Sequence, residues 1–135
     1  NLIIHDKFNV ILYAPAKIRT FETIEVENFH NTSLHASLTY YIDYEDQRVK
    51  NFLMKYRALF GTEPTQFAFQ GYDVARYFLG LYSKYGEYWN QMIDKSDSNM
   101  LQSNFVCRPV PEGGFTNTGI KRIIYGKDYS IIPVK

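Results

Sequence analysis

The residues that could carry out chemistry are few and lie far apart along the chain. The densest acidic group, Asp43, Glu45 and Asp46, comes just before a helical pattern. Carboxylates in that position cap a helix and interact with its dipole, which explains them better than paired-carboxylate acid–base catalysis does. The sequence also lacks the G-x-G-x-x-G, P-loop, H-E-x-x-H, C-x-x-C and G-x-S-x-G motifs. We therefore predict a protein that is not an enzyme and that uses no cofactor.

Two histidines come nearest to a metal-binding pattern. His30 and His35 lie five residues apart, with Glu25 and Glu27 upstream of them. This spacing matches no zinc site, and all four positions are expected to be exposed. We predict no metal site.

The single cysteine, Cys107, lies between apolar neighbours in a predicted strand. A nucleophilic cysteine needs a base, and the three histidines all belong to the first third of the chain. We therefore predict that Cys107 is a buried structural residue.

The composition is that of a folded domain. The chain has 135 residues, of which 45% are hydrophobic and 21% are charged, with a formal net charge of +1. This length fits a single unit, residues 1–135, and the balanced charge gives no support for a nucleic-acid partner. Aromatic residues are unusually frequent at 17%, including 12 tyrosines, and tyrosine serves both in a core and on a ligand-facing surface.

No apolar segment is long enough for a signal peptide or a membrane span. The first apolar patch, Leu2 to Ile4, is far too short, and charged or polar residues interrupt every later apolar run. We expect the chain as given to be soluble.

The first forty residues predict a strand–helix–strand unit. The apolar, β-branched run Phe8–Tyr13 predicts a buried strand, and residues 23–30 have helical spacing. Residues 37–42 alternate between two faces, as a strand does. This order implies a right-handed parallel crossover.

Two amphipathic helices are predicted next. The first covers residues 47–60 and ends at Gly61, and the second covers residues 72–85, after an extended stretch at 64–70. Their apolar faces contain Val49, Phe52, Leu53, Tyr56, Leu59 and Phe60 in the first helix, and Val74, Phe78, Leu81, Tyr82 and Tyr85 in the second. Both faces are wide, so we expect part of them to be exposed or covered by another copy of the chain.

The last third of the chain is predicted to be mainly β. After a weaker helix at 87–93, residues 105–108 form a strand and a proline- and glycine-rich turn follows. Residues 120–125 and 129–134 then form an antiparallel hairpin.

One dense block carries a family resemblance. A helix that ends in Tyr56-Arg57-x-x-Phe60-Gly61 is followed by Glu63-Pro64 and then by Gly71-Tyr72-Asp73-x-Ala75. This order resembles the C-terminal portion of the type I periplasmic ligand-binding proteins, the family of branched-chain amino-acid binding proteins and receptor ligand-binding regions. The aromatic richness is similar to a branch of that family found in Bacteroidetes-type bacteria.

The resemblance implies an α/β fold made of three-layer α/β/α lobes with a mostly parallel sheet and a C-terminal β-hairpin. It assigns residues 1–38 to a second-lobe strand and helix and residues 39–46 to a hinge. It assigns residues 47–106 to first-lobe helices and a strand. Residues 107–135 form a terminal hairpin in which the chain crosses back toward the second lobe.

The resemblance also implies a ligand site between the lobes. Tyr40 and Tyr41 match a hinge strand that lines the cleft, and Gln70, Tyr72 and Asp73 match a helix N-terminus facing an anionic ligand group. Other roles stay open: Tyr40 and Tyr72 fit a core equally well, and Asp73 fits a first-turn charge better.

The function that follows from the resemblance is non-catalytic. It is capture or sensing of a small amino-acid-like or cell-wall-derived ligand in the periplasm or cell envelope. A membrane transporter, a receptor or a peptidoglycan-associated protein would be the partner. The alternative is a structural or cell-envelope interaction module that has the same fold but no small-molecule ligand.

Overall fold

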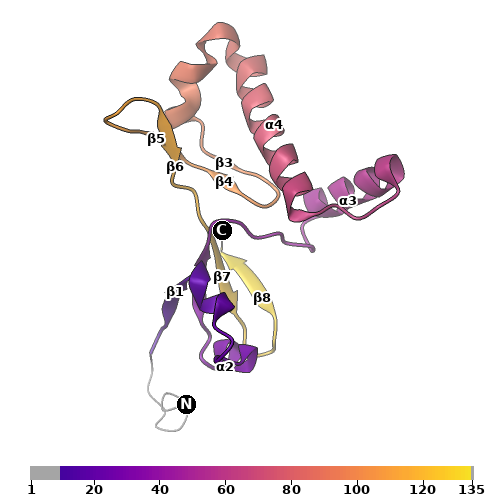
Figure 1. The fold of residues 1–135 in the computed structure, drawn as a ribbon, viewed down its shortest axis with the longest axis vertical. Helices are drawn as coiled ribbons and strands as arrows, with labels where there is room; N and C mark the ends of the chain where they lie inside the picture. The colour runs from indigo at the N-terminus through magenta and orange to yellow at the C-terminus, as the bar shows by residue number, and fades with distance from the viewer. Residues whose placement is uncertain (1–9, 135) are drawn as a thin grey trace. The chain divides into compact units, whose positions relative to one another are not determined.

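The computed structural model describes residues 10–134 and divides the chain into two compact units (Figure 1). Unit 1 combines the segment that ends at Thr39 with the segment that begins at Ile120, and unit 2 is Tyr40–Gly119. This differs from the predicted single unit, because the chain leaves unit 1 after Thr39 and returns to it at Ile120. The first crossing coincides with the start of the predicted hinge segment, residues 39–46.

Unit 1 is a four-stranded sheet with one short helix. Its elements are β1 (Tyr13–Pro15), the 3-10 helix η1 (Ala16–Thr20), α2 (Val26–Asn31), β2 (His35–Leu38), β7 (Lys121–Tyr125) and β8 (Ile131–Val134). The strand order is β1-β2-β7-β8. The predicted parallel pairing of the first two strands and the predicted C-terminal hairpin, β7–β8, are both confirmed. The β2–β7 pair is antiparallel, so within the described residues this sheet is mixed rather than mostly parallel.

Helix α2 contributes two buried residues to the core of unit 1. Phe29 is buried, and its ring lies 5.3 Å from that of Tyr125 on β7. His30 is also buried, and its Nδ1 lies 2.7 Å from the carbonyl oxygen of Gly126. The prediction that His30 is exposed is therefore wrong. The prediction that Phe8–Tyr13 forms a buried strand is wrong in its described part, because β1 begins only at Tyr13 and Val10, Ile11 and Tyr13 are exposed. Residues 1–9 of the predicted 1–38 segment lie outside the described residues.

Unit 2 contains the two long helices and two short strand pairs. Its elements are α3 (Gln47–Phe60), α4 (Gln66–Tyr85), the 3-10 helix η2 (Gly86–Lys95), β3 (Ser98–Asn99), β4 (Asn104–Phe105), β5 (Cys107–Pro109) and β6 (Phe115–Asn117). The pairs β3–β4 and β5–β6 are both antiparallel. The prediction that residues 107–135 form one terminal hairpin is therefore wrong, because β5–β6 belongs to unit 2 and β7–β8 to unit 1.

Helix α3 has the bounds that its apolar spacing predicts. At its start the Asp46 side chain accepts a hydrogen bond from the Arg48 backbone N–H. At its end Gly61 adopts a left-handed conformation, with φ 65°. A glycine takes this conformation without the steric cost that a side chain would add, which is why the helix ends there.

Helix α4 is longer than predicted and buries a different face. It begins at Gln66, so the predicted extended stretch at 64–70 is wrong. Its buried residues are spaced four apart, which places them on one face: Phe69, Asp73, Tyr77 and Leu81. Tyr82, predicted to be a core residue, is 57% exposed. The expectation that part of the predicted apolar faces is exposed is confirmed, since Leu59, Phe60 and Tyr82 are all exposed.

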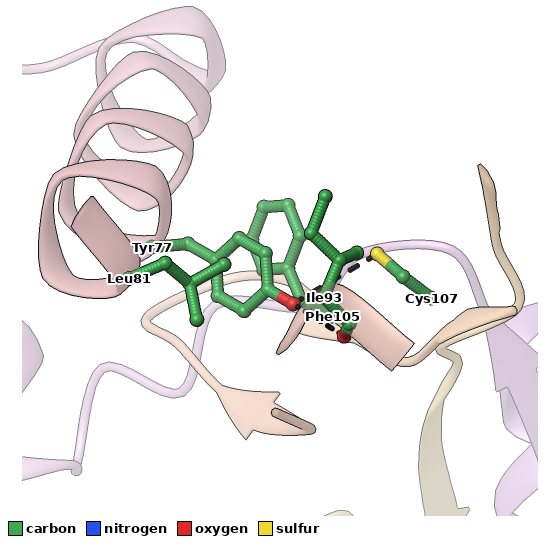
Figure 2. Packing of buried hydrophobic residues seen from close by; sticks show 5 residues of the cluster. All are labelled: Tyr77, Leu81, Ile93, Phe105 and Cys107. Carbon is green, nitrogen blue, oxygen red and sulfur yellow. Dashed lines mark hydrogen bonds between the residues drawn. The ribbon is translucent and has the colours of Figure 1, made fainter. Parts of the chain in front are cut away.

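The α4–η2–β5 core of unit 2 forms around Tyr77 (Figure 2). The Tyr77 ring stacks on Phe105 with a centroid distance of 4.4 Å and an interplanar angle of 11°. Its hydroxyl donates to the Ile93 carbonyl at 3.3 Å and lies 4.0 Å from the Cys107 sulfur. Burial, together with Cys107, raises the pKa of Tyr77 above its ordinary value of 10.0. Cys107 is buried in a strand, as predicted.

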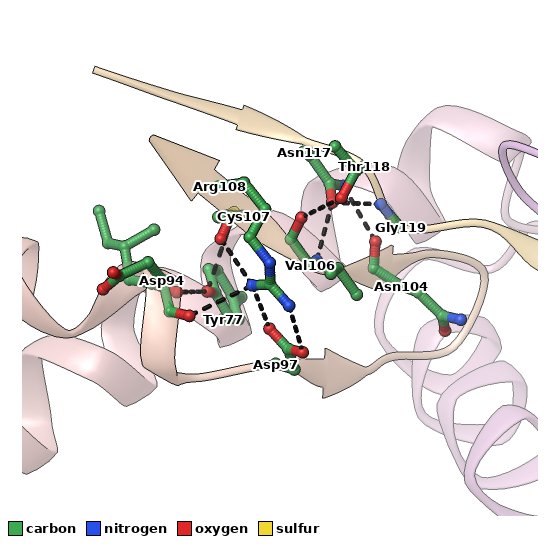
Figure 3. A network of polar contacts seen from close by, with 11 residues as sticks. Tyr77, Asp94, Asp97, Asn104, Val106, Cys107, Arg108, Asn117, Thr118 and Gly119 are labelled. Carbon is green, nitrogen blue, oxygen red and sulfur yellow. Dashed lines mark hydrogen bonds and ion pairs between the residues drawn. The ribbon is translucent and has the colours of Figure 1, made fainter. Parts of the chain in front are cut away.

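A polar network ties the end of unit 2 to the neighbouring strand segment (Figure 3). The Asn117 side chain accepts from the Val106 N–H at 2.8 Å and donates to the Asn104 carbonyl at 2.9 Å. Thr118 donates to Val106 through both its backbone N–H and its hydroxyl, at 2.9 Å each. These bonds hold the residues that precede the return to unit 1.

Residues 10–134 contain no helix that is both long enough and apolar enough to cross a membrane.

Candidate functional site

The five residues predicted to bind ligand do not form one site. Tyr40 and Tyr41 are the first residues of unit 2, and the Tyr41 backbone N–H donates to the Gln102 carbonyl at 2.8 Å. Tyr40 is 42% exposed, so its ring does not belong to the core. Gln70 is exposed on α4, in its second turn. Of the five, only Tyr72 lines the groove described below.

Asp73 has a different position from the predicted one. It lies in the interior of α4 rather than at its N-terminus, and it is fully buried. Its carboxylate accepts the backbone N–H groups of Leu101, Gln102 and Ser103, at 2.9, 2.9 and 3.0 Å. The predicted anion site at a helix start near Tyr72 is therefore wrong, because the helix begins earlier and the carboxylate is used internally.

A well-formed cavity of unit 2 is the α3–α4 groove, with a volume of about 510 Å³. Most of its lining comes from one side of α3, and the rest comes from α4 and the segment after β3. The lining residues are Arg48, Asn51, Phe52, Lys55, Tyr56, Leu59, Phe60, Tyr72, Arg76, Met100 and Leu101.

Aromatic rings form a continuous wall of the α3–α4 groove. Phe52 contacts the ring of Tyr72 on the other helix at 4.8 Å and the ring of Tyr56 on its own helix at 5.7 Å. Tyr56 in turn contacts Phe60 at 4.6 Å. Phe52 also packs against the buried Phe69 at 4.7 Å, which anchors this wall to the core. The wall offers apolar contact area with polar hydroxyl tips at its tyrosines.

The charged lining of the groove has a single sign. It includes Arg48, Lys55 and Arg76 but no carboxylate. Arg48 pairs with Asp46 at 2.7 Å and donates to the Asn99 carbonyl at 2.9 Å. The hydrogen bond to Asp46 raises the pKa of the Arg48 guanidinium, so this residue stays charged and fixed in position.

Sequence reasoning missed this groove for a definite reason. It described α3 by its apolar face and gave the basic residues of that helix no role. Lys50 and Arg57 pair with Glu45 and Glu63 at 2.7 and 2.6 Å. Arg48 and Lys55, however, are spaced four and three residues from Phe52 and so lie on the same stripe as the rings. That spacing was the feature of the sequence from which a basic, aromatic groove could have been predicted.

The arrangement is suited to non-covalent binding. Guanidinium and ammonium groups hold anions through charge-assisted hydrogen bonds, and the rings hold an apolar body. Among residues 10–134, no group of three or more His, Cys, Asp and Glu side chains lies close enough to hold a metal ion.

Comparison with known proteins gives a likeness of fold. No protein-family model matches the sequence, and no curated protein matches it significantly. The structure is similar to a crystal structure from Rhodospirillum rubrum that is provisionally described as a branched-chain amino acid ABC transporter. The TM-score is 0.52 at 15% sequence identity, and the match covers 96% of this chain but 38% of the other. The chain therefore has a mixed α/β fold that matches part of a structure of the periplasmic-binding-protein type.

Proposed function

We propose that the chain is the C-terminal portion of a non-catalytic solute-binding or sensing protein of the type I periplasmic class. The main support is the likeness of fold, which extends over 96% of the chain. The division into two units that the chain connects twice agrees with it, since proteins that close on a ligand pivot at such connections. The ligand class that we propose is a small amino-acid-like or cell-wall-derived molecule.

The proposal includes a place of action. A protein of this type works in the periplasm or cell envelope and hands its ligand, or the resulting signal, to a transporter, a receptor or a peptidoglycan-associated partner. The finer resemblance to a Bacteroidetes branch is part of the same proposal.

Exposed aromatic residues in each of the two units favour a second candidate function. Tyr13, Phe67 and Tyr88 are 73%, 74% and 68% exposed. Exposed rings of this size are typical of surfaces that contact a protein or a glycan. A cell-envelope interaction module that has no small-molecule ligand would use them in this way.

A ligand screen distinguishes the two candidates. Thermal unfolding of the 135-residue chain is measured with amino acids, dipeptides and cell-wall muropeptides. A ligand at a hundredfold excess over its dissociation constant stabilises the folded state by about 2.7 kcal/mol, which raises the unfolding temperature measurably. The Tyr41→Ala variant should lose this response, and Tyr88→Ala, which removes a ring of the same type elsewhere in unit 2, should keep it. If no compound shifts the unfolding temperature, solute binding is wrong; binding to intact peptidoglycan or self-association would then support the second candidate.

A further inference from the structure

Arg76 differs from every other arginine of unit 2. Arg48, Arg57 and Arg108 each pair with a carboxylate, at 2.7, 2.6 and 2.9 Å. Arg76 lines the α3–α4 groove from α4, and within the described part of the chain it has no ion pair. The guanidinium therefore keeps its forked set of donors available.

Lys55 supplies a second such charge from the opposite helix. It lines the same groove from α3, and within residues 10–134 it too forms no ion pair, whereas Lys50 on the same helix pairs with Glu45 at 2.7 Å. Two cations without carboxylate partners thus face one cavity from two helices. Because no Asp or Glu lines that cavity, its potential favours an anion.

The remaining lining of the groove indicates which kind of apolar group the bound anion carries. Phe52, Tyr56 and Tyr72 provide ring surfaces, and Leu101 is a buried apolar residue of the lining. The cavity volume of about 510 Å³ lies within the usual range for small-molecule sites. A small ion such as inorganic phosphate would leave the rings without contacts, whereas a carboxylate attached to an aromatic or branched apolar group would use both features.

We infer that the α3–α4 groove binds a small carboxylate with an apolar body, whose carboxylate is held by Arg76 and Lys55 and whose body packs on the ring wall. This site goes beyond the proposed function, because it is formed entirely by unit 2 and does not depend on the other unit.

The test compares carboxylates with their neutral analogues. N-acetyl-L-phenylalanine and N-acetyl-L-leucine are titrated at pH 7 into the ¹⁵N-labelled chain, alongside the corresponding amides. The carboxylates should shift amide signals of α3, α4 and residues 100–101, and each amide analogue should bind about tenfold more weakly. Phenyl phosphate serves as a second anion and should bind more weakly than the carboxylates.

Single substitutions identify the charged side chain that binds the ligand carboxylate. Arg76→Gln should weaken carboxylate binding about tenfold and leave amide binding unchanged, and Lys55→Gln should act in the same direction. Arg19→Gln removes the same charge from unit 1 and should change nothing. Arg76 has no ion pair to break, so its variant should fold, and its own spectrum checks this directly.

Several results would overturn the site. They are equal binding of carboxylate and amide, signal shifts that map outside the groove, an Arg76→Gln variant that binds normally, or no shifts up to about 10 mM ligand. Failure here leaves the proposed function standing, because that function is tested by Tyr41→Ala and a different ligand panel. A ligand found in that screen whose binding resists Arg76→Gln would support the proposed function alone.

Discussion

The Asp73 carboxylate accepts the backbone N–H of Gln102, 29 positions further along the chain, at a distance of 2.9 Å. The carbonyl of the same Gln102 accepts the N–H of Tyr41 at 2.8 Å. A single buried side chain in α4 thus organises the 101–103 segment, and this segment in turn holds the irregular segment at Tyr41 through which the chain enters unit 2. Asp73 is a positioning residue for the first crossing.

Replacing Asp73 should therefore destabilise unit 2 strongly. In Asp73→Asn one carboxylate oxygen becomes an NH₂ group that faces backbone N–H groups, so buried donors lose their acceptor. We expect a loss of about 3 kcal/mol in the free energy of unfolding. Urea unfolding followed through Trp89, the single tryptophan, reports on this unit. Asp94→Asn, a half-buried carboxyl in the same unit, should cost far less; equal losses in the two variants would contradict the role of Asp73.

Gly119 should not tolerate a side chain. A Cβ atom there would overlap the Asn104 carbonyl oxygen and lie 2.6 Å from its carbon. These are backbone atoms, so the chain itself must shift, and we expect Gly119→Ala to cost about 2 kcal/mol. Gly80→Ala is the matched change, since nothing lies within 4 Å of its Cβ position in α4. That substitution should stabilise the helix by about 1 kcal/mol. Thermal unfolding followed by circular dichroism compares the two, and opposite signs are expected.

Tyr77 and Tyr82 should respond differently to loss of the hydroxyl. Tyr77→Phe removes a buried donor to the Ile93 carbonyl and should cost about 1 kcal/mol. Tyr82→Phe changes an exposed ring and should have no measurable effect on the free energy of unfolding. Chemical denaturation at pH 7 measures both variants. A loss in Tyr82→Phe as large as that in Tyr77→Phe would show that the buried face of α4 is assigned wrongly.

Tyr77 also predicts a decrease in stability at alkaline pH. The pKa of Tyr77 is raised in the folded state, so its neutral form is favoured there. The resulting stability is fully present below the unfolded pKa, about 10, and is lost as the pH rises above that value. Urea midpoints at pH 8 to 11 should fall more steeply for the natural chain than for Tyr77→Phe. Parallel curves would contradict this prediction.

The ion pair between Asp97 and Arg108 predicts that the stability of the fold decreases at acidic pH. A hydrogen bond from Arg108 lowers its pKa below the ordinary value of 3.8 (Figure 3). The stabilisation that this pair contributes is present above that value and is lost as the pH falls through the lowered pKa. A ¹³C titration of the Asp97 carboxyl should show the lowered value, and Arg108→Gln should return it to the ordinary range. Arg57→Gln, which breaks the pair with Glu63, should leave Asp97 unchanged.

Local patterns made part of the fold predictable. Helix α3 follows from its apolar spacing and from Gly61, both of which act within a few residues. Helix α4 was harder, because the alternation of polar residues with Phe67 and Phe69 imitates an extended strand. Its buried face was misassigned because it contains Asp73, an acidic residue whose charge ordinarily places it outside the core.

The site was less predictable because it depends on non-local pairing. The sequence pattern does not show that the partners of Asp73 are amides in the 101–103 segment, or that Arg76 lies across a groove from Lys55. Such relationships arise only when α3 and α4 pack together. The first crossing had a local signal near Tyr40. The return had none: the family resemblance implied it within residues 107–135, and its position at Ile120 follows from the pairing of β7 with β2.

The pairing of β2 with β7 has a consequence for the order in which the protein is made. The ribosome completes all of Tyr40–Gly119 before it supplies the antiparallel neighbour of β2. Until then the parallel pair β1–β2 has an open edge, whereas unit 2 already has its whole sequence and can fold. The nascent chain is therefore open to wrong strand pairing at this edge of β2 until β7 has been translated.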